Sequence, residues 1–165
     1  YKGAVTSMTM TRAGWLLAQV LRIVGGPLPV SLKALGPAVV AVSEDAELGG
    51  QAWIRTYSRA GRFPQVVHSA KRFRGPTGLE EYVGYGIGMT LSVAVEGDAL
   101  VFRSARYYLE IGRARVYLPR LLEPGVLTVT HRQESAEVFS FRLTLIHRVL
   151  GVVLDQVAHF RDVDP

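Results

Sequence analysis

The sequence predicts a mainly β fold: an antiparallel, up-and-down sheet that curls or closes into a barrel, with one short N-terminal amphipathic helix. Glycine, β-branched and aromatic residues are plentiful, with 17 Gly among 165 residues, which favours strands over a helical bundle. Short runs with alternating apolar residues recur between turn residues, at the spacing of about 8–12 residues that is typical of sandwiches and barrels. One segment near the N-terminus has helical periodicity instead.

The helix is predicted over residues 13–24. Thr11 precedes the apolar run as an N-cap, and Gly25, Gly26 and Pro27 follow it as stop signals. A single apolar helix among strands is expected to pack against the sheet or to plug one end of a barrel. Its apolar stripe consists of Trp15, Leu16, Leu17, Val20, Leu21 and Ile23.

Strand patterns follow from residue 28 onward. The clearest is 87–95, where Ile87, Met89, Leu91, Val93 and Val95 share one face. Sequential hairpins predict about nine or ten strands, lipocalin-like in outline. Because no linker, repeat or composition shift stands out, residues 1–165 are expected to form a single domain. The other predicted strands are 3–10, 38–42, 51–58, 99–111, 114–118, 126–134, 138–147 and 152–161.

Composition excludes several classes of function. The chain has no Cys, so it has no disulfide, thiolate nucleophile or thiolate metal site, which suits a cytoplasmic protein. No apolar run reaches the roughly 20 residues of a membrane span, so no membrane partner is expected. The net charge is +5, but the basic residues are scattered. Their densest cluster, residues 71–74, is short, so nucleic acid is not expected either.

Motifs in the second half of the chain carry a family resemblance. They are FRG at 73–75, GLEEYVG at 78–84, GMTL at 88–91, ALVFRS at 99–104, LP at 118–119, PGVLTVTH at 124–131 and HRVLG at 147–151, with Gln156 and Phe160 in the last strand. The sequence resembles the bacterial domain-of-unknown-function family numbered four-one-six-six, whose members occur alone or fused behind a saccharopine-dehydrogenase-like domain. Arg148 stands where the relatives usually have Pro. The resemblance implies no catalytic residue, because the family has no assigned activity.

Three polar side chains share strand faces with apolar residues in the last three strands. By alternation, His131 lies with Val129, His147 lies with Phe141, and Gln156 lies with other apolar side chains. A small polar cluster in an apolar interior is how ligand pockets are usually lined. The alternative is that each His is a structural residue near a strand end. Two His without a nearby carboxylate or Cys make an incomplete ligand set, so no metal is expected.

Adjacent carboxylates give a second candidate. Neighbouring strand residues point to opposite faces, so Glu80 and Glu81 cannot act as one acid–base pair. Glu81, with Tyr82 or Arg103 in reach, is a candidate interior general acid or base. The favoured alternative is a salt bridge to one of the sixteen Arg.

The inward face of residues 99–111 stays open. If Phe102 points inward, so does Tyr108; if Val101 points inward, so do Arg103 and Tyr107. The catalytic candidates are therefore His131, His147, Glu81 and Tyr82. The ligand-binding candidates are Gln156, Trp53, Met89, Phe102, Phe141 and Arg103, although a Trp, Met and Phe stripe is more often plain core.

These candidates predict binding of an apolar small molecule in the barrel interior, without a cofactor. Cofactor-independent cyclase or isomerase chemistry is an extension of this hypothesis, because a cavity can fold a flexible substrate into a reactive conformer. The alternative is a non-catalytic module that docks to a partner enzyme or subunit, and a homo-oligomer stays open.

Overall fold

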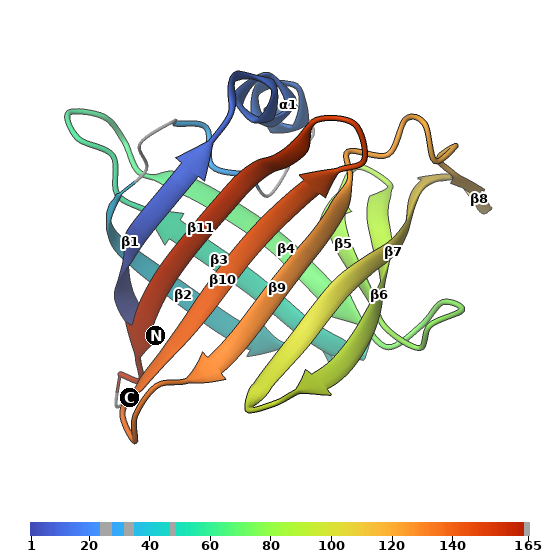
Figure 1. Cartoon of the computed structure of the whole chain (residues 1–165). Helices are drawn as coiled ribbons and strands as arrows, with labels where there is room; N and C mark the ends of the chain where they lie inside the picture. Colours follow the sequence, from blue (N-terminus) through green and yellow to red (C-terminus); the bar gives the residue numbers. More distant parts are fainter. Residues whose placement is uncertain (24–27, 32–34, 47–48, 164–165) are drawn as a thin grey trace.

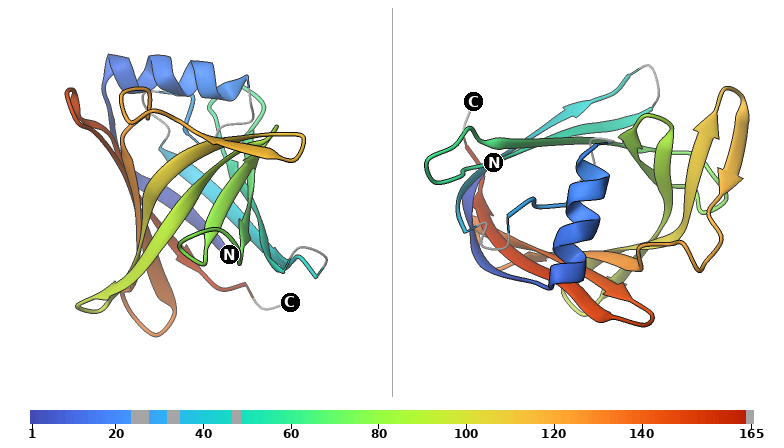
Figure 2. Two further views of the ribbon diagram at one scale, coloured as in Figure 1. Left: turned by 90° about the vertical axis from the view of Figure 1, so that its right-hand side faces the viewer. Right: turned by 90° about the horizontal axis from the view of Figure 1, so that it is seen from above.

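Ten antiparallel strands close into a barrel, and a short helix lies across one of its ends (Figures 1 and 2). The computed structural model describes residues 1–23, 28–31, 35–46 and 49–163. Its elements are β1 (Lys2–Met10), α1 (Arg12–Arg22), β2 (Gly36–Glu44), β3 (Gly50–Tyr57), β4 (Gln65–Arg72), β5 (Glu80–Gly84), β6 (Ile87–Glu96), β7 (Ala99–Ile111), β8 (Ala114–Tyr117), β9 (Val126–Gln133), β10 (Val138–His147) and β11 (Gly151–Arg161).

The barrel closes through pairing of consecutive strands and of the first strand with the last. β1 pairs with both β2 and β11, and β6 pairs with β7 along its whole length. The departure from a simple up-and-down order is at β7. Its first half pairs with β9 inside the barrel wall, whereas its last four residues pair with β8, which lies outside the wall. The predicted mainly β fold with one helix is confirmed, and closure is now established.

Two wall strands, β4 and β5, are absent from the predicted strand ranges, although Glu80 and Glu81 are expected to be neighbouring strand residues. In β4 the buried side chain of Ser69 and the half-buried side chain of Lys71 point into the barrel. They replace the apolar residues that make a strand recognisable by alternation. In β5 both Glu80 and Glu81 are buried, on opposite faces. Because these inward positions are polar, neither segment has the apolar alternation by which a strand is recognised in a sequence.

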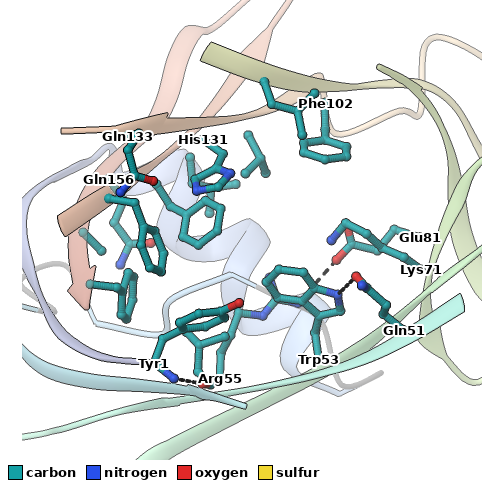
Figure 3. Close-up of a pocket in the computed structure, with 18 of the residues that line it drawn as sticks. Tyr1, Gln51, Trp53, Arg55, Lys71, Glu81, Phe102, His131, Gln133 and Gln156 are labelled. Atoms are coloured by element: carbon teal, nitrogen blue, oxygen red, sulfur yellow. Dashed lines mark hydrogen bonds and ion pairs between the residues drawn. The ribbon is translucent and has the colours of Figure 1, made fainter. Parts of the chain in front are cut away.

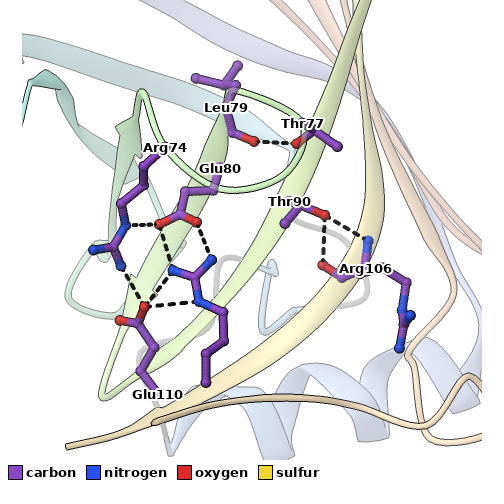
Figure 4. A network of polar contacts seen from close by, with 8 residues as sticks. Arg74, Thr77, Leu79, Glu80, Thr90, Arg106 and Glu110 are labelled. Atoms are coloured by element: carbon purple, nitrogen blue, oxygen red, sulfur yellow. Dashed lines mark hydrogen bonds and ion pairs between the residues drawn. The ribbon is translucent and has the colours of Figure 1, made fainter. Parts of the chain in front are cut away.

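A β-bulge in β7 decides which of its residues point inward. Leu91 pairs with Ser104 while Thr90 pairs with Arg106, so Ala105 is an extra residue. The Thr90 hydroxyl accepts a hydrogen bond from the Arg106 amide at 3.1 Å beside the bulge (Figure 4). Because alternation shifts there, neither predicted face of β7 holds along its length. Phe102 and Tyr107 both pack on the inner core, although they are five residues apart.

Helix α1 closes one end of the barrel. Thr11 is its N-cap, as predicted, and the Thr11 hydroxyl accepts from the Gly14 amide at 3.1 Å. Gly14 and Ala18 form the buried side, and Leu17 and Leu21 flank the core beneath the helix. The predicted stop signals, residues 25–27, lie outside the described residues. No helix in the described ranges is long and apolar enough to cross a bilayer.

The rest of the predicted stripe on α1 does not face the barrel. The exposed fractions of Leu16, Val20 and Ile23 are 59%, 63% and 82%. The helix is apolar on two sides, and helical spacing alone does not distinguish them. Small residues at 14 and 18 let one side approach the strands closely, which leaves these larger side chains on the opposite side.

Replacing Gly14 by Ala tests this close approach. A Cβ at this position would collide with the carbonyl oxygen of Val153 in β11. Helix propensity alone would stabilise the variant by about 1 kcal/mol, whereas overpacking costs about 1–3 kcal/mol. The net destabilisation is at most about 2 kcal/mol, so we expect a lower melting temperature by calorimetry, by up to about 8 °C. A higher melting temperature would show that α1 does not sit on β11.

Candidate functional site

The barrel encloses a cavity of about 440 Å³ whose lining is largely aromatic and aliphatic. The core beneath α1, which includes Leu145 and Leu154, forms its floor. Exposed lining residues lie at the end of the barrel opposite α1: Phe73, Gln133 and Asp162. The cavity therefore opens at that end, which we call the open end.

One wall of the cavity is aromatic and comes from β9, β10 and β11. The His131 ring lies 4.7 Å from the Phe141 ring and 5.2 Å from the Phe139 ring, centroid to centroid. Phe160 stacks on Phe139 at 6.0 Å, and Trp53 of β3 meets Phe141 edge-on at 6.2 Å. These strands form hairpins with direct pairing, which brings alternate aromatic residues of one face together.

The facing wall is charged and comes from β3, β4 and β5 (Figure 3). Glu81 accepts a hydrogen bond from the Ser69 hydroxyl at 2.7 Å and pairs with Arg55 at 3.3 Å and Lys71 at 3.8 Å. Arg55 also donates to the Ser69 hydroxyl. The Lys71 ammonium lies 4.2 Å from the centre of the Trp53 ring, a cation–π contact. Two cations thus share one carboxylate.

The ionisation of this cluster follows from burial and charge. Burial raises the pKa of Glu81, but the charges of Lys71 and Arg55 and the Ser69 hydrogen bond outweigh it and lower that pKa to about 2. The pKa of Lys71 is also lowered, because loss of hydration and repulsion from Arg55 exceed the attraction of Glu81. Glu81 is therefore a fixed negative charge at neutral pH and does not exchange protons there.

His131 and Gln156 reach the cavity from the aromatic side (Figure 3). Burial lowers the pKa of His131, so its imidazole is neutral at pH 7. Gln156 is only 4% exposed, and its Nε2 has no hydrogen-bond partner. The Nε of Arg55 is likewise buried without a partner. A buried donor without an acceptor is costly, by about 1–3 kcal/mol, so two residues that line the cavity carry unused hydrogen-bonding capacity just beneath its surface.

Six of the sequence-predicted site residues line the cavity together: Glu81, His131, Gln156, Trp53, Phe102 and Phe141. His147 does not, because it lies six residues beyond Phe141 on β10, a rise of roughly 20 Å. It lies past the core beneath α1, where its Nδ1 accepts from the Val149 and Leu150 amides of the β10–β11 turn. The expected grouping of His147 with His131 and Gln156 is therefore wrong.

Three other predicted residues also lie outside the cavity. Tyr82 is on the opposite face of β5 from Glu81; its hydroxyl accepts from the Gly86 amide, and Arg72 stacks on its ring. Arg103 pairs with Glu96 on the exposed side of the wall. Met89 is buried in the core beneath α1. Tyr82 and Arg103 were expected within reach of Glu81, and neither contacts it. The favoured alternative, a salt bridge between Glu81 and an Arg, is present with Arg55.

Sequence reasoning missed Arg55, Lys71 and Ser69 as parts of the site. One signal was present for Arg55: it shares a strand face with Trp53, so an inward Trp53 places it inward. Lys71 and Ser69 gave no such signal, because β4 was not recognised. Within the described part of the chain, no group of three or more His, Asp or Glu side chains is arranged to hold a metal.

Fold and site together define a closed antiparallel barrel with an internal, largely apolar cavity and one buried charged cluster. The chain belongs to the family described as a domain of unknown function (DUF4166), which matches residues 1–160. The resemblance carried by residues 73–160 thus extends over nearly the whole chain. No curated protein and no solved structure matches it.

Proposed function

We propose that the barrel binds an apolar small molecule that carries an oxygen acceptor. The observation that carries this proposal is the cavity itself. Its volume of about 440 Å³ lies in the range of about 300–1,000 Å³ of small-molecule sites. Its lining, aromatic side chains with a few convergent polar groups, is the usual composition of such sites. Side chains just fill the interior of a barrel of about eight strands, and the wider interior of this ten-stranded barrel leaves room for a ligand.

The polar groups specify the chemistry of the ligand. The Arg55 Nε and the Gln156 Nε2 are buried donors without a partner, and once either side chain turns toward the cavity it would donate to an acceptor such as a carbonyl or carboxylate oxygen. Arg55 and Lys71 carry two positive charges against the one negative charge of Glu81. A neutral or anionic head group therefore suits the cavity better than a cationic one.

Cyclase or isomerase chemistry remains part of the proposal as a second step. His131 is the cavity residue suited to proton transfer, since it is neutral at pH 7 and faces the interior. Glu81 is suited to hold positive charge instead, because its low pKa keeps it ionised. The alternative function, docking to a partner enzyme or subunit, gives no reason for a cavity with unused buried donors.

Titration with cis-parinaric acid, a fluorescent fatty acid, tests the binding proposal. We expect saturable binding at pH 7 and quenching of tryptophan emission, because Trp53 lines the cavity. Replacing the lining residue Ala158 by Trp fills the space and is expected to weaken binding at least about tenfold, a loss of roughly 1.4 kcal/mol. The methyl ester of the probe, which lacks the charge, is expected to bind more weakly than the acid.

The matched control is Val66→Trp, which adds the same side chain on the outer face of β4, where Val66 is 59% exposed. This variant should bind the acid like the parent protein. Equal affinity of the parent and Ala158→Trp would contradict binding in the cavity, provided that circular dichroism shows both variants folded.

A further inference from the structure

The α1 end of the barrel carries an unusual number of exposed apolar side chains. They come from four segments that lie at this end: α1, the β3–β4 loop, the β8–β9 loop and the β10–β11 turn (Figures 1 and 2). We call this set the α1-end surface: Leu16, Val20, Ile23, Phe63, Leu121, Leu122, Val149 and Leu150, each between 56% and 92% exposed. Exposed apolar side chains gathered at one end of a molecule favour an interaction site there over scattered surface residues.

Arginines accompany the apolar side chains. Each of the four segments of the α1-end surface has at least one Arg beside its apolar residues: Arg12 and Arg22 on α1, Arg62 before Phe63, Arg120 before Leu121, and Arg148 before Val149. All five are exposed, and none forms an ion pair with a described residue. The positive charge of this end is therefore available to a partner.

Acidic residues lie mostly at the other end of the barrel. In the described loops of the α1 end the one carboxylate is Glu123, and it pairs with Arg106. The open end carries seven described carboxylates: Glu44, Asp45, Glu96, Asp98, Glu134, Glu137 and Asp162. The open end also has cations, Lys2, Arg72, Arg132 and Arg161, which these carboxylates balance. Among the described residues, the cations of the α1 end lack such a balance, so the net positive charge lies at the end that is also apolar.

We propose that the α1-end surface binds the surface of an anionic lipid bilayer. Apolar side chains framed by Arg are the composition of segments that lie in the membrane interface, with apolar residues among the acyl chains and cations at the headgroups. The sequence has no apolar run long enough to span a membrane, and for that reason no membrane partner was expected. Binding at the bilayer surface needs no such run.

A second copy of the chain fits this surface less well than a bilayer. A symmetric dimer through the α1 end would bring the same five arginines of each copy together. The apolar side chains also stand on separate segments rather than in one groove, which suits a deformable lipid surface. The bilayer would hold the barrel with its open end, and hence the cavity, toward water.

Vesicle flotation tests this proposal. The probes are vesicles of phosphatidylcholine alone and of phosphatidylcholine mixed with an equal amount of phosphatidylglycerol. We expect the protein to float with the anionic vesicles only, and less at high salt. Leu16→Asn with Val20→Asn should weaken binding at least about tenfold through lost apolar burial. Arg12→Gln with Arg22→Gln should weaken it roughly 30-fold, since each cation near such a surface contributes about 1 kcal/mol.

The control changes the same residue types at the open end: Val95→Asn with Arg161→Gln, where Val95 is 76% exposed. It should leave flotation unchanged. Failure to bind anionic vesicles would overturn the proposal. An equal loss of binding in the control variant would also overturn it, because binding would then depend on net charge and not on the α1-end surface. A concentration-dependent dimer that Val20→Asn abolishes, without vesicle binding, would also overturn it and would assign the surface to a second copy.

Discussion

Replacing Glu81 by Gln is expected to lower the free energy of unfolding by about 3 kcal/mol at pH 7, because it leaves the largely buried cations Arg55 and Lys71 without their carboxylate. The effect should depend on pH. The pKa of Glu81 falls from 4.5 to about 2 on folding, so its stabilisation is complete above about pH 4.5 and is lost as the pH falls toward 2. A shift of this size corresponds to about 3 kcal/mol.

Urea denaturation from pH 7 to pH 2 measures this dependence. The difference between the parent protein and Glu81→Gln should be largest at neutral pH and should shrink below pH 4.5. Glu96→Gln is the matched control, because Glu96 also pairs with an Arg but lies on the exposed surface. It should change stability little at any pH. A constant difference for Glu81→Gln across this range would contradict the charged cluster.

Replacing Glu80 by Gln is the second large effect that we expect, about 2–3 kcal/mol. Glu80 lies on the outer face of β5 and has no exposed side-chain surface, although it is ionic. It accepts hydrogen bonds from Arg74 and Arg115, and Glu110 bridges the same two arginines (Figure 4). Burial raises the pKa of Glu80, and these hydrogen bonds outweigh it and lower that pKa.

This network joins parts of the outer wall that are distant in sequence. Arg74 comes from the loop after β4, Glu110 from β7 and Arg115 from β8. Glu110→Gln removes a more exposed member, with 25% of its side chain accessible, so its effect should be smaller. The expected order of destabilisation in urea is Glu80→Gln, then Glu110→Gln, then Glu96→Gln. A different order would show that burial does not determine the strength of these ion pairs.

The fold was predictable where one strand face is apolar and the other polar. Residues 87–95 and 138–147 have this pattern, and both are strands of the barrel wall. It was not predictable for β4 and β5, because Lys71 and Glu81 fill inward positions and are acceptable there only within the cluster that they form with Arg55 and Ser69. Pairing across the barrel wall decides such positions, and a single strand does not contain that information.

The candidate site was predictable in the same partial way. Alternation placed His131 and Gln156 on the inner faces of their strands. It failed for His147, because a shared face does not say how far along the barrel a residue lies. It also failed along β7, where one extra residue, Ala105, moves Tyr107 to the inner side. The position of a residue along the barrel axis and the presence of a bulge depend on how neighbouring strands pair. The alternation pattern of a single strand contains neither.

The closure of one barrel end by α1 determines where a ligand would reach the cavity. With the described part of that end filled by helix and core, the cavity opens to solvent beside Phe73, Gln133 and Asp162, so a ligand of the proposed kind would enter and leave at the same place. The barrel would then hold a ligand in a closed-ended cavity and would not provide a channel through the molecule. A molecule that covered the open end would also retain a ligand already bound in the cavity.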